Sequence, residues 1–332
     1  MNKLYLHGMG HFHPENVITN QFLVDLDIGT SEEWILERVG IRTRRTVLPL
    51  DYIKNTKNKN PKAAFEASLY SNAQLAAAAS RIALDRAGIK LEDIGLVISG
   101  SSSTECAAPA EASAVAAELG IEVPCFDLNS ACTTFGTQIN FLSNMRPDAL
   151  PPFVLVVNPE TLTGRVDYSD RKSAVLFGDG SSAAVVSATC PSRAAFTSCH
   201  YGTKPSEWEK VGISWTGYFY QDGNAVQGFA IRKTTDSIRL LQGSYCMNGN
   251  RFIFIGHQAN MGMLQTVCER SRIPEHNHWH NVEYFGNTGC AGAPAVLSQR
   301  WNDLRPHDHV AFSIVGAGLS WVHMILKVED AC

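Results

Sequence analysis

Three polar residues follow apolar runs at points where the chain turns through small residues, and their types suit nucleophilic chemistry. Cys132 lies in NSACTTFG, His257 in GHQAN and Asn287 in GNTG. A helix that begins beside Cys132 would direct free N–H groups and the positive end of its dipole at the sulfur, which favours the thiolate. Unperturbed cysteine titrates at about 8.5, so this stabilisation would produce a nucleophile near neutral pH.

Each of these residues also has a structural explanation when it is taken alone. Free cysteine is among the most buried residue types. A lone histidine is more often a hydrogen-bonded structural residue, and a lone asparagine is more often a turn residue. The combination is informative because all three lie at strand-to-turn junctions. We therefore predict that His257 and Asn287 converge on Cys132.

The elements that must position these residues alternate between short apolar runs and helical segments, as is typical of a layered α/β fold. In the first half we expect strands within 94–100, 123–129, 153–158 and 174–187. In the second half we expect a strand and a turn within 251–260, 282–297 and 309–328.

The two halves of the sequence echo one another. FDLNSACTTFGTQI resembles YFGNTGCAGAPAVL, and FGDGSSAAVVS resembles VGAGLSWVHMILKV. Two related halves that pack together predict a five-layer α/β/α/β/α sandwich. We place the boundary between an N-terminal half, 1–187, which carries Cys132, and a C-terminal half, 188–332, which carries the histidine and the asparagine.

Helices are expected at 21–46, with a capping box of Thr30 and Glu33, and at 63–87, where Gly88 follows as a stop. The lysine-rich stretch between these helices is expected to be a surface loop.

Composition and charge exclude several classes of protein. With 45% hydrophobic residues in 332, the chain can bury a large core. A net charge of -4 gives no basic excess for non-specific nucleic-acid binding. The nine cysteines lack CxxC spacing, so we expect reduced thiols and a cytoplasmic location. We find no signal-peptide pattern and no apolar run that could span a membrane.

Together the motifs resemble the β-ketoacyl-acyl carrier protein synthase III family of the thiolase superfamily. They are PENVITN, TSEEWILERVGIRTRR, SACTTFG, FGDGSSAAV, GHQAN, GNTGCAGAP and GAGLSW, in the family's order over nearly the whole chain. The resemblance implies a ketosynthase in which Cys132 carries an acyl group as a thioester. His257 and Asn287 would assist decarboxylation of a malonyl-type or β-keto extender. The backbone N–H groups of Cys132 and Ala317 would form an oxyanion hole.

The same resemblance implies the partners of the chain. Acyl groups would arrive on CoA or on the phosphopantetheine of an acyl carrier protein, and no other cofactor is expected. A homodimer is expected, with 101–120 near the interface. Trp34 and Arg38 would contact CoA or the phosphopantetheine arm, although a tryptophan and an arginine also suit packing and a salt bridge.

Two substitutions depart from the family pattern. Gly262 stands where the family usually has a basic contact for the carrier protein or the pantetheine phosphate. Ala108 stands where a bulky residue often closes the acyl pocket, so a small residue should admit longer, branched or aryl acyl groups.

Two longer regions also differ from the family. The insertion at 51–74 carries four lysines, which either steer an acidic carrier protein or are simply solvated: Lys54, Lys57, Lys59 and Lys62. The region 188–230 holds an aromatic cluster that would line a substrate pocket or belong to ordinary core: Trp208, Trp215, Tyr218, Phe219 and Tyr220.

These departures resemble a specialised branch that condenses an acyl thioester with a β-ketoacyl partner. Its members then cyclise the product to a cyclohexanedione, the precursor of dialkylresorcinol or stilbene compounds. Glu160 follows the run FVLVVNP and is a possible assisting base for such a second step. Its alternative role is that of a structural carboxylate near a subunit interface.

Three other functions remain open. The chain could pass the acyl group to an oxygen or nitrogen acceptor, or serve as a non-catalytic partner subunit of a ketosynthase, although the intact set of three residues opposes the latter. A cysteine hydrolase would need a water and a base poised at the thioester.

The run EHNHWH contains three alternate histidines without catalytic zinc spacing, so no metal site is expected.

Overall fold

The computed structural model describes residues 1–214, 217–246 and 249–330. Nine strands are hydrogen-bonded in the order β11-β12-β13-β8-β1-β7-β6-β4-β5. Their bounds are β1 (Leu4–Phe12), β4 (Ile94–Ser99), β5 (Cys125–Asp127), β6 (Phe153–Glu160), β7 (Gly180–Ser187), β8 (Ala194–Thr203), β11 (Phe252–Gly256), β12 (His309–Gly316) and β13 (Ser320–Val328). Two small hairpin sheets pair β2 (Asn16–Thr19) with β3 (Thr43–Thr46) and β9 (Val211–Ile213) with β10 (Phe219–Gln221).

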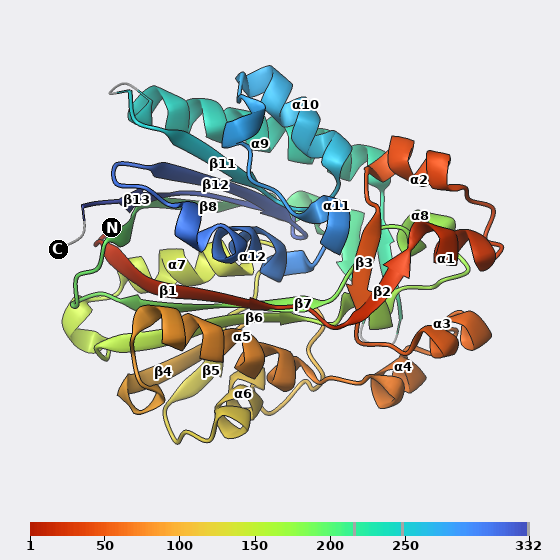
Figure 1. Cartoon of the computed structure of the whole chain (residues 1–332), viewed down its shortest axis with the longest axis horizontal. Helices are drawn as coiled ribbons and strands as arrows, with labels where there is room; N and C mark the ends of the chain where they lie inside the picture. Colours follow the sequence, from red (N-terminus) through yellow and green to blue (C-terminus); the bar gives the residue numbers. More distant parts are fainter. Residues whose placement is uncertain (215–216, 247–248, 331–332) are drawn as a thin grey trace.

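The long sheet is folded into two layers. Strands β1 and β8 pair only at Leu4–Leu6, so the sheet is continuous there and separates elsewhere. Helices α7 (Thr134–Asn144) and α12 (Gly292–Gln299) lie between the two sheet layers. Figure 1 shows the outer layers, with α5 (Asn72–Ala87) and α6 (Glu111–Leu119) on one side and α9 (Gly223–Tyr245) and α10 (Met261–Ser271) on the other. The predicted α/β/α/β/α sandwich is therefore confirmed.

The strand order repeats between the halves. The order β4-β6-β7-β1 on one side matches β11-β12-β13-β8 on the other. In each set the first two strands are parallel, as the pairs β4 with β6 and β11 with β12 show. The remaining neighbours within each set are antiparallel. The predicted boundary after residue 187 falls between β7 and β8.

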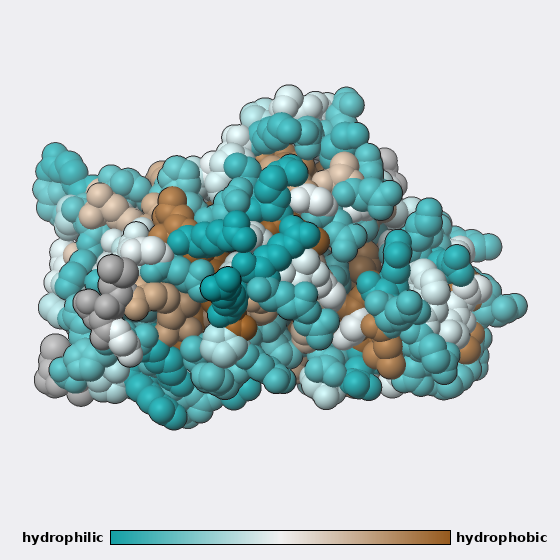
Figure 2. Space-filling model, turned by 90° about the horizontal axis from the view of Figure 1, so that it is seen from above, coloured by the Kyte–Doolittle hydropathy of each residue, from teal (hydrophilic) through white to brown (hydrophobic). Residues whose placement is uncertain are grey.

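The core explains why these runs form strands and inner helices. All eight residues of β7 are buried, as are seven of eight in β6 and β12, which is typical of strands covered on both faces. Seven of the eight residues of α12 are buried, because this helix is covered by sheet on two sides. The face that carries α9 and α10 is mostly hydrophilic, with separate apolar patches (Figure 2).

Several local predictions were wrong, each for a traceable reason. The helix expected at 21–46 is two short helices, α1 (Asn20–Asp25) and α2 (Glu32–Val39). The N-cap of α2 is Ser31, whose side chain accepts the Trp34 N–H, so the predicted capping box at Thr30 is displaced by one residue. Gly40 ends α2 with φ 66, and the chain then continues as strand β3.

Other boundaries were also misplaced. The helix expected at 63–87 is interrupted, because Ser71 caps a new helix, α5, which ends at Gly88 as predicted. The run 282–285 forms the helical turn α11 (Val282–Phe285) instead of a strand. A four-residue turn that returns immediately to the core lacks the length that separates a strand from a helix by periodicity.

The lysine-rich insertion is folded. It forms α3 (Leu50–Thr56) and α4 (Pro61–Ala67), joined by Asn58. The Asn58 side chain is buried and donates to the carbonyl oxygens of Gly164 and Val166 at 3.0 and 2.9 Å. These bonds attach the insertion to the segment that follows β6. The prediction of a loop was wrong, because most of the insertion is helical. The remaining short helix is α8 (Arg171–Ala174), and none of the helices in the described ranges is long and apolar enough to cross a membrane.

Candidate active site

Cys132 lies in a tight turn between β5 and α7, and α7 begins two residues later at Thr134. Ala131 has φ 53, a left-handed conformation that costs a residue with a side chain about 1–3 kcal/mol. Its N–H donates to Asn129 Oδ1 at 2.8 Å, which holds the turn. Gly316 packs against the turn, since a Cβ at this position would lie 3.1 Å from Cys132 N. The backbone of Cys132 is thus adjacent to the 316–318 turn, which contains Ala317.

The protonation state of Cys132 differs from the sequence-based expectation. The predicted helix start is present beside the thiol. However, burial, together with the charge of Glu160, raises the pKa of Cys132 to about 12. Desolvation therefore outweighs the helix dipole, and the resting group is the thiol. Attack on a thioester from this state requires that a proton leave the sulfur as the new bond forms.

His257 directly follows β11, and its backbone N–H donates to Ser313 O at 3.0 Å. Burial lowers the pKa of His257 to about 4, so the ring is neutral near pH 7. Its Nδ1 has no hydrogen-bond partner among the residues that the structure describes. A neutral imidazole offers one donor and one acceptor, which suits both proton removal and hydrogen bonding to an oxygen.

Asn287 follows α11 and is fixed through its backbone and its side-chain oxygen. Its N–H donates to Leu176 O at 2.9 Å, and its carbonyl accepts the Gly178 N–H at 3.1 Å. Asn287 Oδ1 accepts the N–H of Gly289 at 3.0 Å. Because the oxygen is engaged, the Nδ2 hydrogens are left as the donors that face the cavity.

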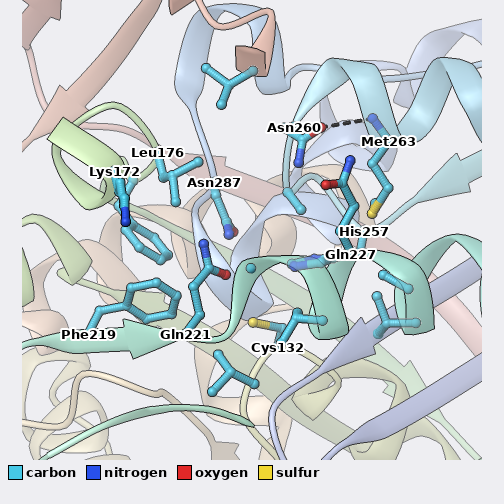
Figure 3. Close-up of a pocket in the computed structure, with 18 of the residues that line it drawn as sticks. Cys132, Lys172, Leu176, Phe219, Gln221, Gln227, His257, Asn260, Met263 and Asn287 are labelled. Atoms are coloured by element: carbon cyan, nitrogen blue, oxygen red, sulfur yellow. Dashed lines mark hydrogen bonds between the residues drawn. The ribbon is translucent and has the colours of Figure 1, made fainter. Parts of the chain in front are cut away.

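One cavity of about 430 Å³ brings the three residues together. Figure 3 shows Cys132, His257 and Asn287 reaching it from three different elements, with Gln221 extending toward Asn287. Ala317 also lines this cavity. The rest of the lining is largely apolar and includes Val175, Leu176, Phe177, Phe219, Phe229 and Met263. The pocket can therefore hold an acyl chain beside a nucleophile and two hydrogen-bond donors.

Trp34 and Arg38, which the resemblance assigns to contacts with CoA or the phosphopantetheine arm, line the same cavity. Two neighbouring cations that no sequence motif had indicated, Arg171 and Lys172, also line it. The Arg171 guanidinium lies 4.9 Å from the centre of the Trp34 ring. Two adjacent basic residues can be recognised in DYSDRK. Their contact with Trp34 could not be predicted, because Trp34 is far away in the sequence. The amides of Gln221 and Gln227 also line the cavity and were not predicted, because they too are far in the sequence from the other lining residues.

Two predicted substrate contacts do not line the cavity of this chain. Ala108 is exposed on the segment after β4, together with Ala107 and Pro109. Gly262 lies in the first turn of α10, and a Cβ there would approach only Asn260 Oδ1, at 3.6 Å. Any contact of Ala108 with an acyl group would have to be made in a partner subunit.

Glu160 is buried at the end of β6, and it too is absent from the cavity lining. Its two carboxylate oxygens accept hydrogen bonds from the 101–103 turn and from Cys290. Burial raises the pKa of Glu160, and the hydrogen bonds from Cys290 and the serines act in the opposite direction. In this arrangement the carboxylate contacts protein donors on both sides.

The aromatic cluster predicted at 208–220 is dispersed. Phe219 lines the cavity and packs against Phe177 at 4.6 Å between ring centres. The Tyr218 hydroxyl donates to Asn58 O at 2.6 Å, so it joins the hairpin to the insertion. Trp208 and Tyr220 are exposed. Trp215 lies outside the described residues.

The histidine run packs against the sheet edge. His278 stacks on Phe254 at 5.5 Å and contacts His280 at 4.7 Å between ring centres. Within the ranges that the structure describes, no group of three or more His, Cys, Asp or Glu side chains could hold a metal ion.

Comparisons with known proteins agree with this geometry. Profiles of the 3-oxoacyl-[acyl-carrier-protein (ACP)] synthase III family match residues 126–205, and its C-terminal profile matches residues 252–328. The beta-ketoacyl-[acyl-carrier-protein] synthase III of Nostoc sp. is 32% identical over 95% of this chain and 94% of its own length.

Solved structures are similar over the same extent. The 3-oxoacyl-[acyl-carrier-protein] synthase III of Aquifex aeolicus superposes with a TM-score of 0.85 at 26% identity, covering 98% of this chain and 99% of its own. The priming beta-ketosynthase of the R1128 polyketide biosynthetic pathway superposes with a TM-score of 0.81 at 26% identity, covering 99% and 97%.

Proposed function

We propose, since this chain belongs to the 3-oxoacyl-[acyl-carrier-protein] synthase III family, that it is a ketosynthase whose nucleophile is Cys132. The family is one of acyltransferases, and the chain is an enzyme of that class. The proposal rests on one observation, namely that Cys132, His257 and Asn287 line one largely apolar cavity. A ketosynthase joins two acyl groups through a new carbon-carbon bond.

The first half-reaction loads the nucleophile. Cys132 Sγ attacks the carbonyl carbon of an acyl thioester, and the thiol proton passes to the departing CoA or phosphopantetheine sulfur. Because His257 is neutral, its ring can carry that proton between the two sulfurs. The backbone N–H groups of Cys132 and Ala317 are the proposed donors to the oxygen that becomes negative during attack.

The second half-reaction forms the carbon-carbon bond. Loss of CO2 from a malonyl-type extender leaves its electron pair as an enolate, whose oxygen would accept hydrogen bonds from His257 and Asn287 Nδ2. The enolate carbon then attacks the Cys132 thioester, and the sulfur leaves as a thiolate that takes a proton from solvent. A neutral imidazole and an amide are suited to this task, since each donates a hydrogen bond without removing a proton from the extender.

Substrates are proposed to arrive on CoA or on an acyl carrier protein, as the names of the relatives indicate for those proteins. Trp34 and Arg38 are the proposed contacts of the carrier's nucleotide or pantetheine arm, and the adjacent Arg171 and Lys172 add positive charge at the same part of the cavity. The exposed Lys54, Lys59 and Lys62 of the insertion would steer an acidic carrier protein. Gly262 supplies no charge to that contact.

A homodimer is the proposed assembly. Among the described strands, β5 pairs only with β4 and ends the long sheet, and the neighbouring segment 107–109 is exposed. An open sheet edge beside exposed apolar residues is suited to pairing with a second copy. In such a dimer Ala108 would reach the acyl pocket of the partner, and its small side chain would leave room for long or branched chains.

We propose more specifically that condensation is followed by ring closure to a cyclohexanedione. A β-ketoacyl partner lacks the extender carboxylate, so a base must take a proton from the carbon between its carbonyl groups. The folded insertion, the small Ala108 and the amides of Gln221 and Gln227 in the cavity favour a larger, more oxygenated substrate than a short acyl group. The role of Glu160 as the assisting base stays a prediction.

Intact-protein mass spectrometry on wild type and Cys132→Ala, with a panel of acyl-CoA and acyl-carrier thioesters, tests the proposal. An acyl adduct on wild type alone, followed by a β-keto product with the extender, is the expected result. A cyclic product from a β-ketoacyl thioester would support ring closure, and linear products alone would exclude it. Transfer to an alcohol or amine would identify an acyltransferase that uses an oxygen or nitrogen acceptor, and absence of any adduct would indicate a non-catalytic subunit.

A further inference from the structure

The Glu160 carboxylate connects three segments that are far apart in the sequence. Its Oε2 accepts hydrogen bonds from Ser101 Oγ, Ser102 N–H and Ser103 Oγ at 3.2, 3.0 and 2.9 Å. Its Oε1 accepts the N–H and the S–H of Cys290 at 3.2 and 3.1 Å. Two of these donors are backbone N–H groups, which cannot turn away, so the arrangement suits an acceptor on both oxygens.

The second set of contacts leads directly to Asn287. Gly289 has φ 54, and a Cβ at this position would lie 2.4 Å from Glu160 Oε1, so the carboxylate packs against the glycine backbone. The N–H of the same glycine donates to Asn287 Oδ1 at 3.0 Å. A continuous path thus runs from the carboxylate through the 289–290 turn to the side-chain oxygen of Asn287.

The direction of the Asn287 amide decides whether this residue offers a donor or an acceptor to the cavity. The two ends of an amide have nearly the same shape and opposite hydrogen-bonding character. If the turn relaxed, Asn287 could rotate and present its oxygen to a developing negative charge, which would repel it. Figure 3 shows the Asn287 side chain directed into the cavity that holds Cys132 and His257.

We propose that Glu160 is a positioning residue, which holds the 289–290 turn so that the Gly289 N–H fixes the Asn287 amide with its NH2 group toward the enolate. This inference rests on the proposed ketosynthase function. It differs from the assisting-base role, because the carboxylate does not line the cavity and its oxygens contact protein donors. The residue acts on the second half-reaction through Asn287.

The charge of Glu160 gives a test that separates this role from a general structural one. Burial is the main cause of the raised pKa of the Cys132 thiol, and the Glu160 carboxylate raises it further, so removal of the carboxylate should favour the thiolate. Replacement by glutamine keeps the size of the side chain but opposes an NH2 group to a backbone N–H on one side. Glu160→Gln should therefore leave loading of Cys132 unchanged or faster, while it slows condensation.

The experiment measures the two half-reactions separately on full-length wild type and Glu160→Gln. Loading is followed as the acyl adduct by mass spectrometry, and as the rate of Cys132 alkylation by iodoacetamide against pH. Condensation is followed as CO2 release and β-keto product from malonyl thioester and pre-loaded enzyme. We expect condensation to fall about 10- to 100-fold, with alkylation that is equal or faster and a profile moved to lower pH.

Two further variants keep the test decisive. Glu111→Gln is the matched control, because Glu111 is also buried but bonds to Asn72 and not to the 287–291 turn; its condensation rate should stay within about threefold. Gly289→Ala leaves the Glu160 charge in place and displaces the turn, so it should slow condensation without moving the alkylation profile. It serves as the second variant if Glu160→Gln does not fold.

The other outcomes overturn the positioning role. Unchanged condensation in Glu160→Gln would exclude it, and loss of ring closure alone would identify Glu160 as the assisting base. An equal fall of loading and condensation, with a lower melting temperature, would show that the carboxylate only stabilises the fold. Failure of wild type to load Cys132 would instead remove the proposed function itself, and is seen before any variant is compared.

Discussion

The two halves of the molecule place a reactive side chain before an inner helix, but their turns are constructed differently. In the first half, Cys132 precedes α7 by two residues, so the cysteine is adjacent to the N-terminal end of the helix. In the second half, the turn Gly289–Ala291 separates Asn287 from α12, which begins at Gly292. The first turn is strained at Ala131, whereas the second uses glycines at its positive φ positions.

This difference matches the chemistry that each residue is proposed to perform. A nucleophile gains from a helix N-terminus, since the dipole favours negative charge on the sulfur as it forms. A hydrogen-bond donor needs only a set orientation, which the Gly289 N–H provides by engaging the Asn287 oxygen. One duplicated framework thus supplies electrostatic support in one half and orientation in the other.

Cys132→Ala should abolish loading and lower condensation by about 10⁴-fold or more, since it removes the atom that carries the acyl group. Adduct formation by mass spectrometry and product formation from an acyl thioester and an extender are the measurements. Cys268→Ala is the matched control, because this cysteine in α10 does not line the cavity. An acyl adduct on the Cys132→Ala protein would show that the nucleophile lies elsewhere.

Asn287→Ala should lower condensation by about 100-fold, because one of two donors to the enolate is lost. Loading of Cys132 should change by less than about threefold, since the proposed division assigns this donor only to the second step. Single-turnover assays with pre-loaded enzyme separate the two steps. Asn144→Ala, at the exposed end of α7, is the control. A parallel loss of loading would contradict the assignment of separate tasks to the two turns.

The reactivity of Cys132 should rise with pH through the alkaline range. Its pKa is raised to about 12, so the thiolate fraction grows about tenfold for each pH unit between 7 and 9. Initial rates of iodoacetamide modification, followed at Cys132 by peptide mass spectrometry, measure this slope. His257 has a lowered pKa of about 4 and stays neutral over this range, so its titration adds nothing to the profile. A plateau below pH 8 would show that the helix dipole outweighs burial.

Ala108→Phe should change acyl selectivity by about tenfold, in favour of short chains over long ones. This effect is the smallest, because the residue is proposed to shape the partner's pocket and to leave both turns intact. Competition between acyl-CoA substrates of different length gives the ratio of kcat/KM directly. Phenylalanine at Ala107, an equally exposed neighbour, serves as the comparison. Unaltered selectivity would indicate that this segment does not reach an acyl pocket.

Much of the fold could be read from the sequence, because its strands are long, apolar and flanked by glycine turns. The runs at 94–100 and 309–328 contain β4 and the pair β12–β13, and the run at 153–158 covers all of β6 except its last two residues. The repeated motifs also indicated two related halves, and the strand order repeats accordingly. Short elements were misread where a local pattern had too few residues to show a period, as in the helical turn 282–285 and the two helices of the insertion.

The residues of the candidate site could also be predicted only in part. The residues that end strands or begin turns, Cys132, His257 and Asn287, were visible in the sequence and do line one cavity. The contact between Arg171 and Trp34 could not be predicted, because it joins segments that are brought together only by folding.

The alternation of strands and helices and the identity of the chemical groups follow from the sequence alone, because both depend on residues that are close in the chain. The protonation of Cys132 depends on the folded arrangement, since burial by distant segments outweighs the effect of the adjacent helix. It likewise decided the position of Glu160, whose carboxylate joins the 101–103 turn to Cys290. Desolvation and long-range hydrogen bonds arise only when the layers pack together, so no local pattern can reveal them.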